Sequence, residues 1–306
     1  MSTAPLVSVV IPTYNRPQPL AACLQALAAQ DYPRDRYEVI VVDDGSPQSP
    51  APLFAALPEM TVRLIVQQRR GPAAARNAGA AVAHGRILAF TDDDCRPHPD
   101  WLRALSLRSA SAPNALVGGA IRNALPDNPY ADASQILVGY IYDYYNRPQG
   151  ARFFTSNNIA MPREQFLAIG GFDAGYPRAA AEDRDFCDRW LDAGYPLLYA
   201  PEARIDHAHA LDLRRFWRQH FNYGRGAYHF HRGRAVRNQQ EIRVEPLRFY
   251  GNLLAAPLNN RPLNQALPRV GLLFLSQAAN ALGFFVERAV QAGGPAQSPL
   301  RRTGMQ

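Results

Sequence analysis

The sequence has 306 residues, 47% of them apolar and 19% charged, so the chain can bury a sizeable core and is not intrinsically disordered. Its formal net charge is +7, and its basic side chains, histidine apart, are all arginines, which favours anionic partners such as phosphates and lipid headgroups. The three cysteines are widely spaced without a C-x-x-C pair, which indicates neither a disulfide framework nor a zinc knuckle. We therefore expect a reducing cytoplasm.

The amino-terminal stretch MSTAPLVSVVIPTYNR contains an apolar run that breaks at Pro12. No basic segment precedes this run and no cleavage site follows it, so it predicts a buried first strand rather than a secretory signal. We expect the protein to remain in the cytoplasm where it is made.

Short β-rich runs alternate with Ala- and Leu-rich stretches from residue 7 to residue 90. The strand-like runs are VSVVIP, YEVIVVDD, VRLIVQQ and RILAF, and the helical stretches include PLAACLQALAAQ and GPAAARNAGAAVAHG. Unbroken hydrophobic strands separated by helices predict an α/β fold with a mostly parallel, Rossmann-like sheet covered on both faces. Such sheets bind ligands at the carboxyl ends of their strands.

Polar residues follow three of these strands: residues 13–15 after the first, 43–44 after the second and 92–94 after the fourth. Adjacent carboxylates repel one another, so the run Asp92, Asp93, Asp94 requires compensation by a cation or by water. Asp92 and Asp94 can project to the same side of a turn and hold Mg²⁺ or Mn²⁺ together with substrate phosphates. A solvated loop is the alternative, but the position of the run in a nucleotide-binding type of sheet favours a metal.

The second half of the chain is less regular. An amphipathic stretch runs to Ser109, a strand is predicted at ALVGGA, and a helix that begins at Glu182 and Asp183 ends at Gly194. Carboxylates suit a helix N-terminus, so for these two residues capping and interaction with the helix dipole is the simple structural explanation.

Five consecutive motifs resemble those of the family 2 glycosyltransferases in order and spacing. They are VSVVIPTYNRPQPLAACLQAL, YEVIVVDDGS, GPAAARNAGAAVAHGRILAFTDDDCRPHPDWL, NNIAMPREQFLAIGGFD and AEDRDFCDRWLDAGY, and the resemblance covers roughly residues 6–230. It implies a GT-A fold and transfer of a sugar from a nucleotide diphosphate sugar, UDP- or dTDP-linked, to an acceptor hydroxyl. It also implies inversion at the anomeric carbon.

The resemblance assigns the nucleotide site. Pro12, Thr13 and Tyr14 correspond to the loop that packs the base, Asp44 to the residue that hydrogen-bonds the base, and Arg76 to a cation near the base or the diphosphate. The chemistry agrees, because a carboxylate accepts from a base N–H and an arginine fork matches phosphate. For Arg76, a salt bridge on a helix face is the structural alternative.

The triple aspartate corresponds to the metal motif of the family. Asp94 matches the direct ligand, Asp93 the residue that reaches the ribose or a water on the metal, and Asp92 completes the motif. A divalent ion there neutralises the departing diphosphate. His207 lies where relatives carry a histidine near the metal or diphosphate, and His209 is the weaker candidate; a structural role is open for both.

Asp183 matches the general base of the family, which takes the proton of the acceptor hydroxyl, and Glu182 is its neighbour and orienter. Asp185 is the alternative base, since only geometry separates carboxylates so close in sequence. Inversion is a single displacement and needs no nucleophilic side chain.

The amides of Asn157 and Asn158, ahead of the acceptor pocket, either bind sugar hydroxyls or stabilise a turn.

We predict a catalytic domain over residues 1–210, with a nucleotide-sugar half to about residue 100 and an acceptor half after it. A helical extension over 211–293 and a flexible tail over 294–306 follow. In the extension, residues 214–237 interleave arginine with aromatic residues, and residues 270–286 form an apolar helix. This pattern suits peripheral attachment to the cytoplasmic face of a membrane, within reach of a lipid-linked or cell-envelope acceptor. A soluble helical appendage or a contact in a homo-oligomer is the alternative.

Two other functions are compatible with parts of this pattern. A sugar-phosphate nucleotidyltransferase also uses such a sheet, but the Gly-rich loop and basic residue expected after its first strand are replaced by PTYNRPQP. A protein that binds nucleotide sugar without catalysis has no use for Asp183. Nucleic-acid binding requires arginine and aromatic residues on one exposed face, and the upstream motifs explain the chain better. The acceptor, whether a carbohydrate, a lipid-linked sugar or a small molecule, is not specified by the sequence.

Overall fold

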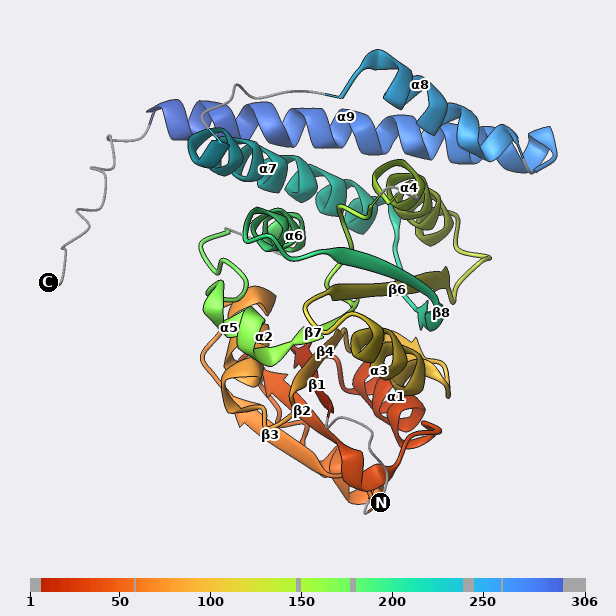
Figure 1. Cartoon of the computed structure of the whole chain (residues 1–306). Helices are drawn as coiled ribbons and strands as arrows, with labels where there is room; N and C mark the ends of the chain where they lie inside the picture. The colour runs from red at the N-terminus through yellow and green to blue at the C-terminus, as the bar shows by residue number, and fades with distance from the viewer. Residues whose placement is uncertain are drawn as a thin grey trace, which may run out of the picture.

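Eight strands form one sheet at the centre of the first two thirds of the chain (Figure 1). The structure is a computed structural model that describes residues 7–57, 59–146, 150–176, 180–238, 245–259 and 261–293. The strands lie in the order β3-β2-β1-β4-β7-β6-β8-β5. Their bounds are β1 Val7–Thr13, β2 Tyr37–Asp43, β3 Val62–Val66, β4 Ile87–Thr91, β5 Cys95–Pro97, β6 Leu116–Asn123, β7 Asn158–Pro162 and β8 Leu197–His207.

The first four strands are parallel, which confirms the prediction from the alternating pattern. β1 pairs with β2 in the register Thr13↔Asp43, and with β4 on its other side in the register Val10↔Phe90. Parallel neighbours end at the same edge of a sheet, so the polar segments that follow β1, β2 and β4 emerge side by side.

The other half of the sheet is mixed. β7 is antiparallel to both β4 and β6, whereas β6 is parallel to β8. The three-residue β5 pairs with the end of β8, so that Cys95 lies opposite His207. This register brings the end of β8 beside the acidic turn that follows β4.

Helices cover both faces of the sheet (Figure 1). One apolar cluster includes Val9 and Leu20 and lies under α1 (Pro17–Ala28) and α3 (Trp101–Ser111). The other includes Val10 and Phe90, and it lies under α2 (Pro72–Val82), α5 (Arg163–Ala168) and α6 (Glu182–Asp192). Both α1 and α2 begin with a proline, whose fixed φ suits the first helical turn. Short 3₁₀ turns lie at Arg34–Arg36, Ala51–Ala56 and Ala256–Leu258.

A segment rich in tyrosine forms α4 (Pro129–Tyr145), a helix that the sequence pattern does not predict. The Asn128 side chain caps it by accepting hydrogen bonds from the backbone N–H groups of Tyr130 and Ala131, each at 3.0 Å. The buried Asp132 of this helix pairs with Arg261 at 2.6 Å and with Arg269 at 3.0 Å, which ties α4 to the carboxyl-terminal part of the chain.

The helical extension consists of α7 (Leu213–Asn238), α8 (Leu247–Ala255) and α9 (Leu263–Gly293), with α7 between α6 and α9 (Figure 1). The expected apolar helix is therefore part of the longer α9. At Gly224 and Gly283, α7 and α9 touch backbone to backbone: added Cβ atoms would lie 1.8 Å and 2.0 Å from carbonyl oxygens of the opposite helix. The tail predicted at 294–306 lies outside the described residues.

Candidate active site

The acidic turn after β4 is surrounded by cationic side chains. Asp93 accepts a hydrogen bond from the Thr13 hydroxyl at 2.8 Å and forms an ion pair with Arg16 at 2.8 Å. Asp94 pairs with the same guanidinium at 2.7 Å, and its carboxylate lies 3.3 Å from Nε2 of His207 and 3.5 Å from Nδ1 of His209. The repulsion expected within the aspartate run is thus balanced from two sides, by the loop after β1 and by the end of β8.

These surroundings shift the pKa values of the buried Asp93 and Asp94 in opposite directions. Burial by itself would raise the pKa of Asp94, but hydrogen bonds from His207 and His209 and the charge of Arg16 hold that pKa well below its usual range. Burial dominates at Asp93 and raises its pKa to about 7 despite Arg16. Asp94 is therefore the carboxylate that stays ionised.

Asp94, His207 and His209 offer ligand atoms that all lie within 4.8 Å of one another, close enough to hold one metal ion. One carboxylate oxygen and two imidazole nitrogens are a donor set that first-row transition metals accept. The residues thus fit a divalent cation. His209, the weaker histidine candidate in the sequence, belongs to this group, whereas the predicted Asp92 does not.

Asp92 instead pairs with Arg76, whose guanidinium lies 2.6 Å from Asp92 and 3.4 Å from Glu182. Arg76 projects from α2 and is only 3% exposed. A surface salt bridge on a helix face is therefore excluded. The buried guanidinium joins the turn after β4 to the amino terminus of α6, two segments about ninety residues apart in the sequence.

Glu182 and Asp183 open α6 behind Ala181, whose φ of 69° is left-handed. An alanine in this conformation is strained, and such residues cluster at functional sites. Burial, followed by the neighbouring Asp183 charge, raises the pKa of Glu182 to about 7. Burial likewise raises the pKa of Asp183, whose carboxylate accepts the backbone N–H of Arg184 at 2.8 Å.

Asp185, the alternative base, lies in a different environment. It is 3% exposed, and its two oxygens pair with Arg189 at 2.7 Å and with Arg237 of α7 at 2.8 Å. Both of its carboxylate oxygens are thus occupied by guanidinium groups, and neither is free to contact an acceptor hydroxyl. The geometry thus distinguishes Asp183 from Asp185, which the sequence did not.

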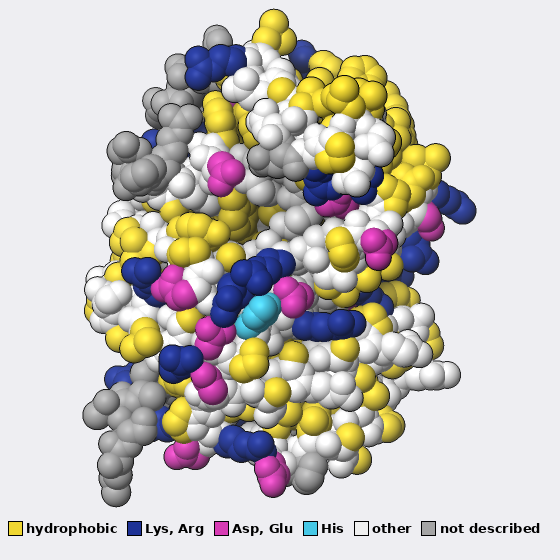
Figure 2. Space-filling model, turned by 90° about the vertical axis from the view of Figure 1, so that its right-hand side faces the viewer, with side chains coloured by type: hydrophobic (Ala, Val, Ile, Leu, Met, Phe, Trp, Pro, Cys, Tyr) yellow, Lys and Arg dark blue, Asp and Glu magenta, His cyan; other side chains and the backbone are white. Residues whose placement is uncertain are grey.

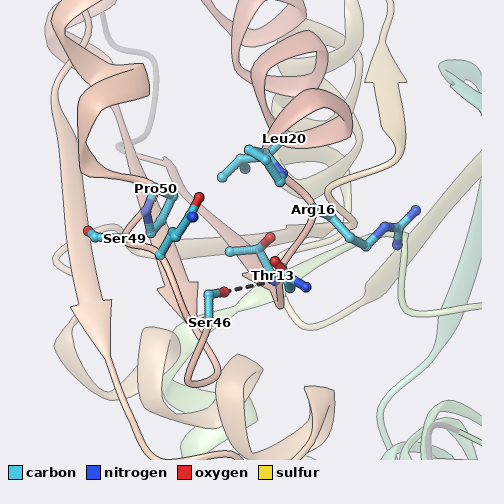
Figure 3. Close-up of a pocket in the computed structure, with 9 residues that line it drawn as sticks. Thr13, Arg16, Leu20, Ser46, Ser49 and Pro50 are labelled. Atoms are coloured by element: carbon cyan, nitrogen blue, oxygen red, sulfur yellow. Dashed lines mark hydrogen bonds between the residues drawn. The ribbon is translucent and has the colours of Figure 1, made fainter.

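Of the predicted base-binding residues Pro12, Thr13 and Tyr14, only Thr13 lines the open recess shown in Figure 3. Thr13, Arg16, Ser46 and Pro50 are among the residues that line it. Pro12 lies at the buried end of β1, outside this lining. The turn is held by Asn15, whose φ is 52° and whose backbone N–H donates to the Ser46 hydroxyl at 2.8 Å.

The side chain of Asp44 organises the loop after β3. It accepts from the Gln67 amide at 2.7 Å and from the backbone N–H groups of Arg70 and Gly71, each at 2.8 Å. A carboxylate has about four acceptor sites, so one remains for a base N–H. Tyr14 lies nearby, with the Arg69 guanidinium 4.1 Å from its ring centroid.

Asn157 and Asn158 are buried and bonded within the protein. Asn158 accepts from the Trp101 indole at 2.8 Å and donates to the carbonyl oxygens of Ala120 and Ala203 at 2.9 and 3.0 Å. Asn157 accepts from the Thr155 hydroxyl at 2.8 Å. These contacts favour the structural role of the two amides over sugar binding.

The family described as Glycosyl transferase family 2 matches residues 8–182, more than half of the chain. This chain belongs to that family. The glycosyltransferase AglE of Haloferax volcanii is 32% identical to it over 235 residues, with 74% of each chain covered. The validoxylamine A glucosyltransferase of Streptomyces hygroscopicus subsp. jinggangensis is 27% identical, and the match covers 72% of this chain but only 62% of that protein.

Solved structures show the fold of this family 2 glycosyltransferase. The mannosyltransferase PcManGT of Pyrobaculum calidifontis, in complex with GDP-Man and Mn²⁺, matches 95% of this chain and 81% of its own, with a TM-score of 0.61 at 23% identity. The GT-A fold predicted from the motifs is thereby confirmed. At this identity the likeness supports the fold alone.

Two contributors to the site of this family 2 glycosyltransferase are Arg16, which the motifs do not assign, and His209, which they favour less than His207. Arg16 stands in the quoted motif PTYNR, but nothing in a single sequence places its side chain over a turn almost eighty residues later. His209 lies just beyond the end of β8, and only the folded chain shows that it reaches Asp94 together with His207.

Proposed function

We propose that this glycosyltransferase is inverting and metal-dependent, and that it transfers a sugar from a nucleoside diphosphate to an acceptor hydroxyl. The observation that supports this most is the Arg76 bridge, 2.6 Å from Asp92 and 3.4 Å from Glu182. Arg76 thereby joins the acidic turn proposed to bind the metal to the Glu182–Asp183 pair proposed to supply the general base. Leaving-group stabilisation and proton abstraction can then act on the same substrate.

Asp94, His207 and His209 would hold the cation. Imidazole ligands suit Mn²⁺ and other transition metals better than Mg²⁺, so we expect Mn²⁺ to be preferred. When bound, the ion supplies positive charge for the diphosphate that leaves. Asp93 is available to the ribose, directly or through water, and Asp92 orients Arg76.

Asp183 would be the general base. Its burial and raised pKa bring its basicity nearer to neutral pH than that of an exposed aspartate, which is where general bases are most effective. It takes the proton of the acceptor hydroxyl while that oxygen attacks the anomeric carbon from the face opposite the diphosphate. Glu182 adds negative charge beside it, and Arg76 limits their mutual repulsion.

Pro12, Thr13, Tyr14 and Asp44 would bind the nucleotide, as the motifs predict. We keep UDP or dTDP as the expected nucleotide, although the PcManGT complex contains GDP-Man. The direct experiment is a donor screen on the full chain with Mn²⁺, in which release of nucleoside diphosphate is measured with and without acceptors. Proton NMR of the product then gives the anomeric configuration. Retention of configuration, or equal rates in a chelator, would contradict the proposal.

We also propose that the extension attaches to an anionic membrane surface. Residues 211–293 hold twelve arginines against four acidic residues, whereas residues 1–210 hold nineteen against twenty-two. The positive charge of the chain therefore resides outside the catalytic part, where it can meet anionic headgroups. A lipid-linked acceptor would then be brought near the site.

The outward face of α9 supports this proposal because it carries large exposed apolar side chains. Ser276 and Glu287 are buried, whereas Phe274 and Phe285 are 65% and 61% exposed. Hydrophobic side chains gather over α8 and α9 at the top of Figure 2. Among the described helices, one, Leu263–Ala292, is long and apolar enough to cross a membrane, with a mean hydropathy of 1.4. An exposed face of this kind suits the apolar side of a bilayer interface.

Sedimentation with phosphatidylglycerol vesicles tests the attachment. We expect the full chain to sediment at low salt and less at high salt, because ions screen the arginines. The double variant Phe274→Ser, Phe285→Ser should stay in the supernatant. The control Val66→Ser, Leu107→Ser, which removes two apolar side chains of similar exposure elsewhere, should sediment like the wild type. Membrane attachment is contradicted if the wild-type chain stays in the supernatant at low salt. It is also contradicted if the double variant still sediments and differs only in oligomeric state, because the outward face of α9 would then bind another protein chain.

A further inference from the structure

Arg16 connects the nucleotide loop with the acidic turn. It follows β1, precedes Pro17 of α1, and points away from Ser46, Ser49 and Pro50 in Figure 3. Its two terminal nitrogens reach two different carboxylates, Nη1 to Asp93 at 2.8 Å and Nη2 to Asp94 at 2.7 Å. Such a forked, charge-assisted contact is strong and geometrically specific.

The guanidinium occupies one of the two Asp94 oxygens that a cation could use; the other, Oδ1, lies 3.3 Å from Nε2 of His207. Oδ2 of Asp94 is 2.7 Å from Arg16 and 3.5 Å from Nδ1 of His209, and Asp94 and His209 belong to the candidate metal group. A guanidinium and a divalent ion repel each other at such short distances, whichever Asp94 oxygen the ion uses. Binding of the ion is therefore opposed while Arg16 holds Asp94.

The side chain of Arg16 is exposed enough to move, whereas those of its two partners are buried. Its side chain is 42% exposed, while those of Asp93 and Asp94 are 4% and 3% exposed. Arg76, the other arginine of the site, is held on both sides by carboxylates and is 4% exposed. Movement of Arg16 toward solvent costs little packing, and the buried carboxylates keep their positions.

We propose that Arg16 is an exchangeable counter-ion, which pairs with Asp93 and Asp94, yields Asp94 to the divalent cation, and then binds the diphosphate of the donor. This rests on the metal-dependent function proposed above. Arg16 lines the recess beside the nucleotide loop, so rotation of its exposed side chain can bring the fork toward a diphosphate. Metal and donor would then bind cooperatively, because the ion releases the arginine that the diphosphate needs.

Electron paramagnetic resonance of free Mn²⁺, titrated with the full chain, measures the exchange without turnover. We expect Arg16→Gln to bind Mn²⁺ alone at least tenfold more tightly than the wild type, because no guanidinium competes. Arg108→Gln is the matched control: it removes the same charge from an arginine of similar exposure, paired with Glu202 at 2.6 Å. Its affinity for Mn²⁺ should equal that of the wild type.

A second titration adds UDP, dTDP or GDP, whichever the wild type binds most tightly. In the wild type the nucleotide should strengthen Mn²⁺ binding, and in Arg16→Gln this gain should fall at least tenfold. Arg16→Lys, which can reach one carboxylate but not both, should lie between the two. Thermal unfolding with and without Mn²⁺ checks folding, and the ion should raise the midpoint of Arg16→Gln more than that of the wild type.

The outcomes separate the two proposals. Equal or weaker Mn²⁺ binding by folded Arg16→Gln, or an undiminished gain from the nucleotide, overturns the exchange while the metal site stands. If Asp94→Asn binds Mn²⁺ as well as the wild type does, the metal site itself is wrong, and the role of Arg16 falls with it.

Discussion

Asp94 and Asp183 are carboxylates of the same candidate site, the first buried and the second half-buried, but their surroundings are opposite. Asp94 faces Arg16, His207 and His209, and these partners lower its pKa although burial opposes them. The described contacts of Asp183 include a backbone N–H at 2.8 Å, and its pKa is raised by burial. A metal ligand must be ionised at all working pH values, whereas a base must be able to take a proton. The surroundings therefore suit each carboxylate to a different task.

The largest expected effect comes from the metal side of this comparison. Asp94→Asn keeps the shape of the side chain but removes the charge that the cation requires, so we expect Mn²⁺ binding to be lost and transfer to fall by about 10³-fold or more. Titration with Mn²⁺ and assay of nucleoside diphosphate release measure both. Asp31→Asn, which removes a surface partner of Arg103, is the control and should leave both unchanged.

On the base side, Asp183→Asn should lower kcat by about 10²- to 10⁴-fold and leave the binding of Mn²⁺ and donor intact. An amide has the shape of the carboxylate without its basicity. Calorimetry with Mn²⁺ and nucleotide, beside steady-state rates, separates binding from chemistry.

Asp185→Asn is the matched comparison. It removes a partner of two arginines and should cost on the order of 3 kcal/mol of stability, while most of the transfer rate remains. If Asp185→Asn loses turnover and Asp183→Asn keeps it, the two assignments must be exchanged.

The raised pKa values predict the pH dependence of catalysis. Asp183 must be ionised to accept a proton, so kcat/KM should fall about tenfold per pH unit on the acid side, beginning above the ordinary carboxyl range. Glu182, with a pKa of about 7, is protonated below that pH and adds no charge beside Asp183 there. Glu182→Gln, which resembles the protonated form, should therefore leave the acid limb in place. A limb that shifts to lower pH would mean that the charge of Glu182 contributes to it.

The same pair predicts how stability depends on pH. The pKa of Glu182 is about 7 in the folded chain against an ordinary value of 4.5, so the folded state binds a proton that the unfolded state releases between these values. The stability from this group is greatest below pH 4.5 and is lost as pH rises to 7. In Glu182→Gln the drop in unfolding free energy between pH 5 and pH 8 should shrink by on the order of 1–3 kcal/mol. Urea unfolding at the two pH values measures it.

Much of the metal side could be predicted from sequence, because it follows strand ends. The order of β-rich runs fixed the edge at which Thr13, Asp44 and Asp94 emerge, and the GT-A fold confirmed it. The partners that Asp92 and Asp94 contact could not be predicted. Asp92 binds Arg76 while His209 joins Asp94, and both depend on the packing of α2 and the register of β8.

The base side depended more on tertiary structure. The motif placed Asp183 at the start of a helix, but capping and catalysis share that pattern. Only the ion pairs of Asp185 with Arg189 and Arg237 distinguish the two aspartates, and Arg237 lies in the extension, more than fifty residues away. Sequence periodicity does not reveal such long-range partners, so the sequence predicts a separate extension over 211–293 and no contact between it and Asp185.

The smallest expected effect tests whether the extension supports the base. Arg237 of α7 pairs with Asp185 at 2.8 Å and with Asp188 at 2.7 Å, which fixes the outer face of α6, whose first turn carries Asp183. In Arg237→Gln, α6 keeps its other contacts, so we expect a two- to fivefold lower kcat through a less well-oriented base. Binding of Mn²⁺ should not change, because the metal side is anchored by β4 and β8. Arg215→Gln, on the same helix and paired with nearby Asp212, should retain wild-type kcat. An Arg237→Gln variant with full activity would show that α7 and α6 are packed together without any mechanical consequence for the base, and the two carboxylate sites would then be set by the sheet alone.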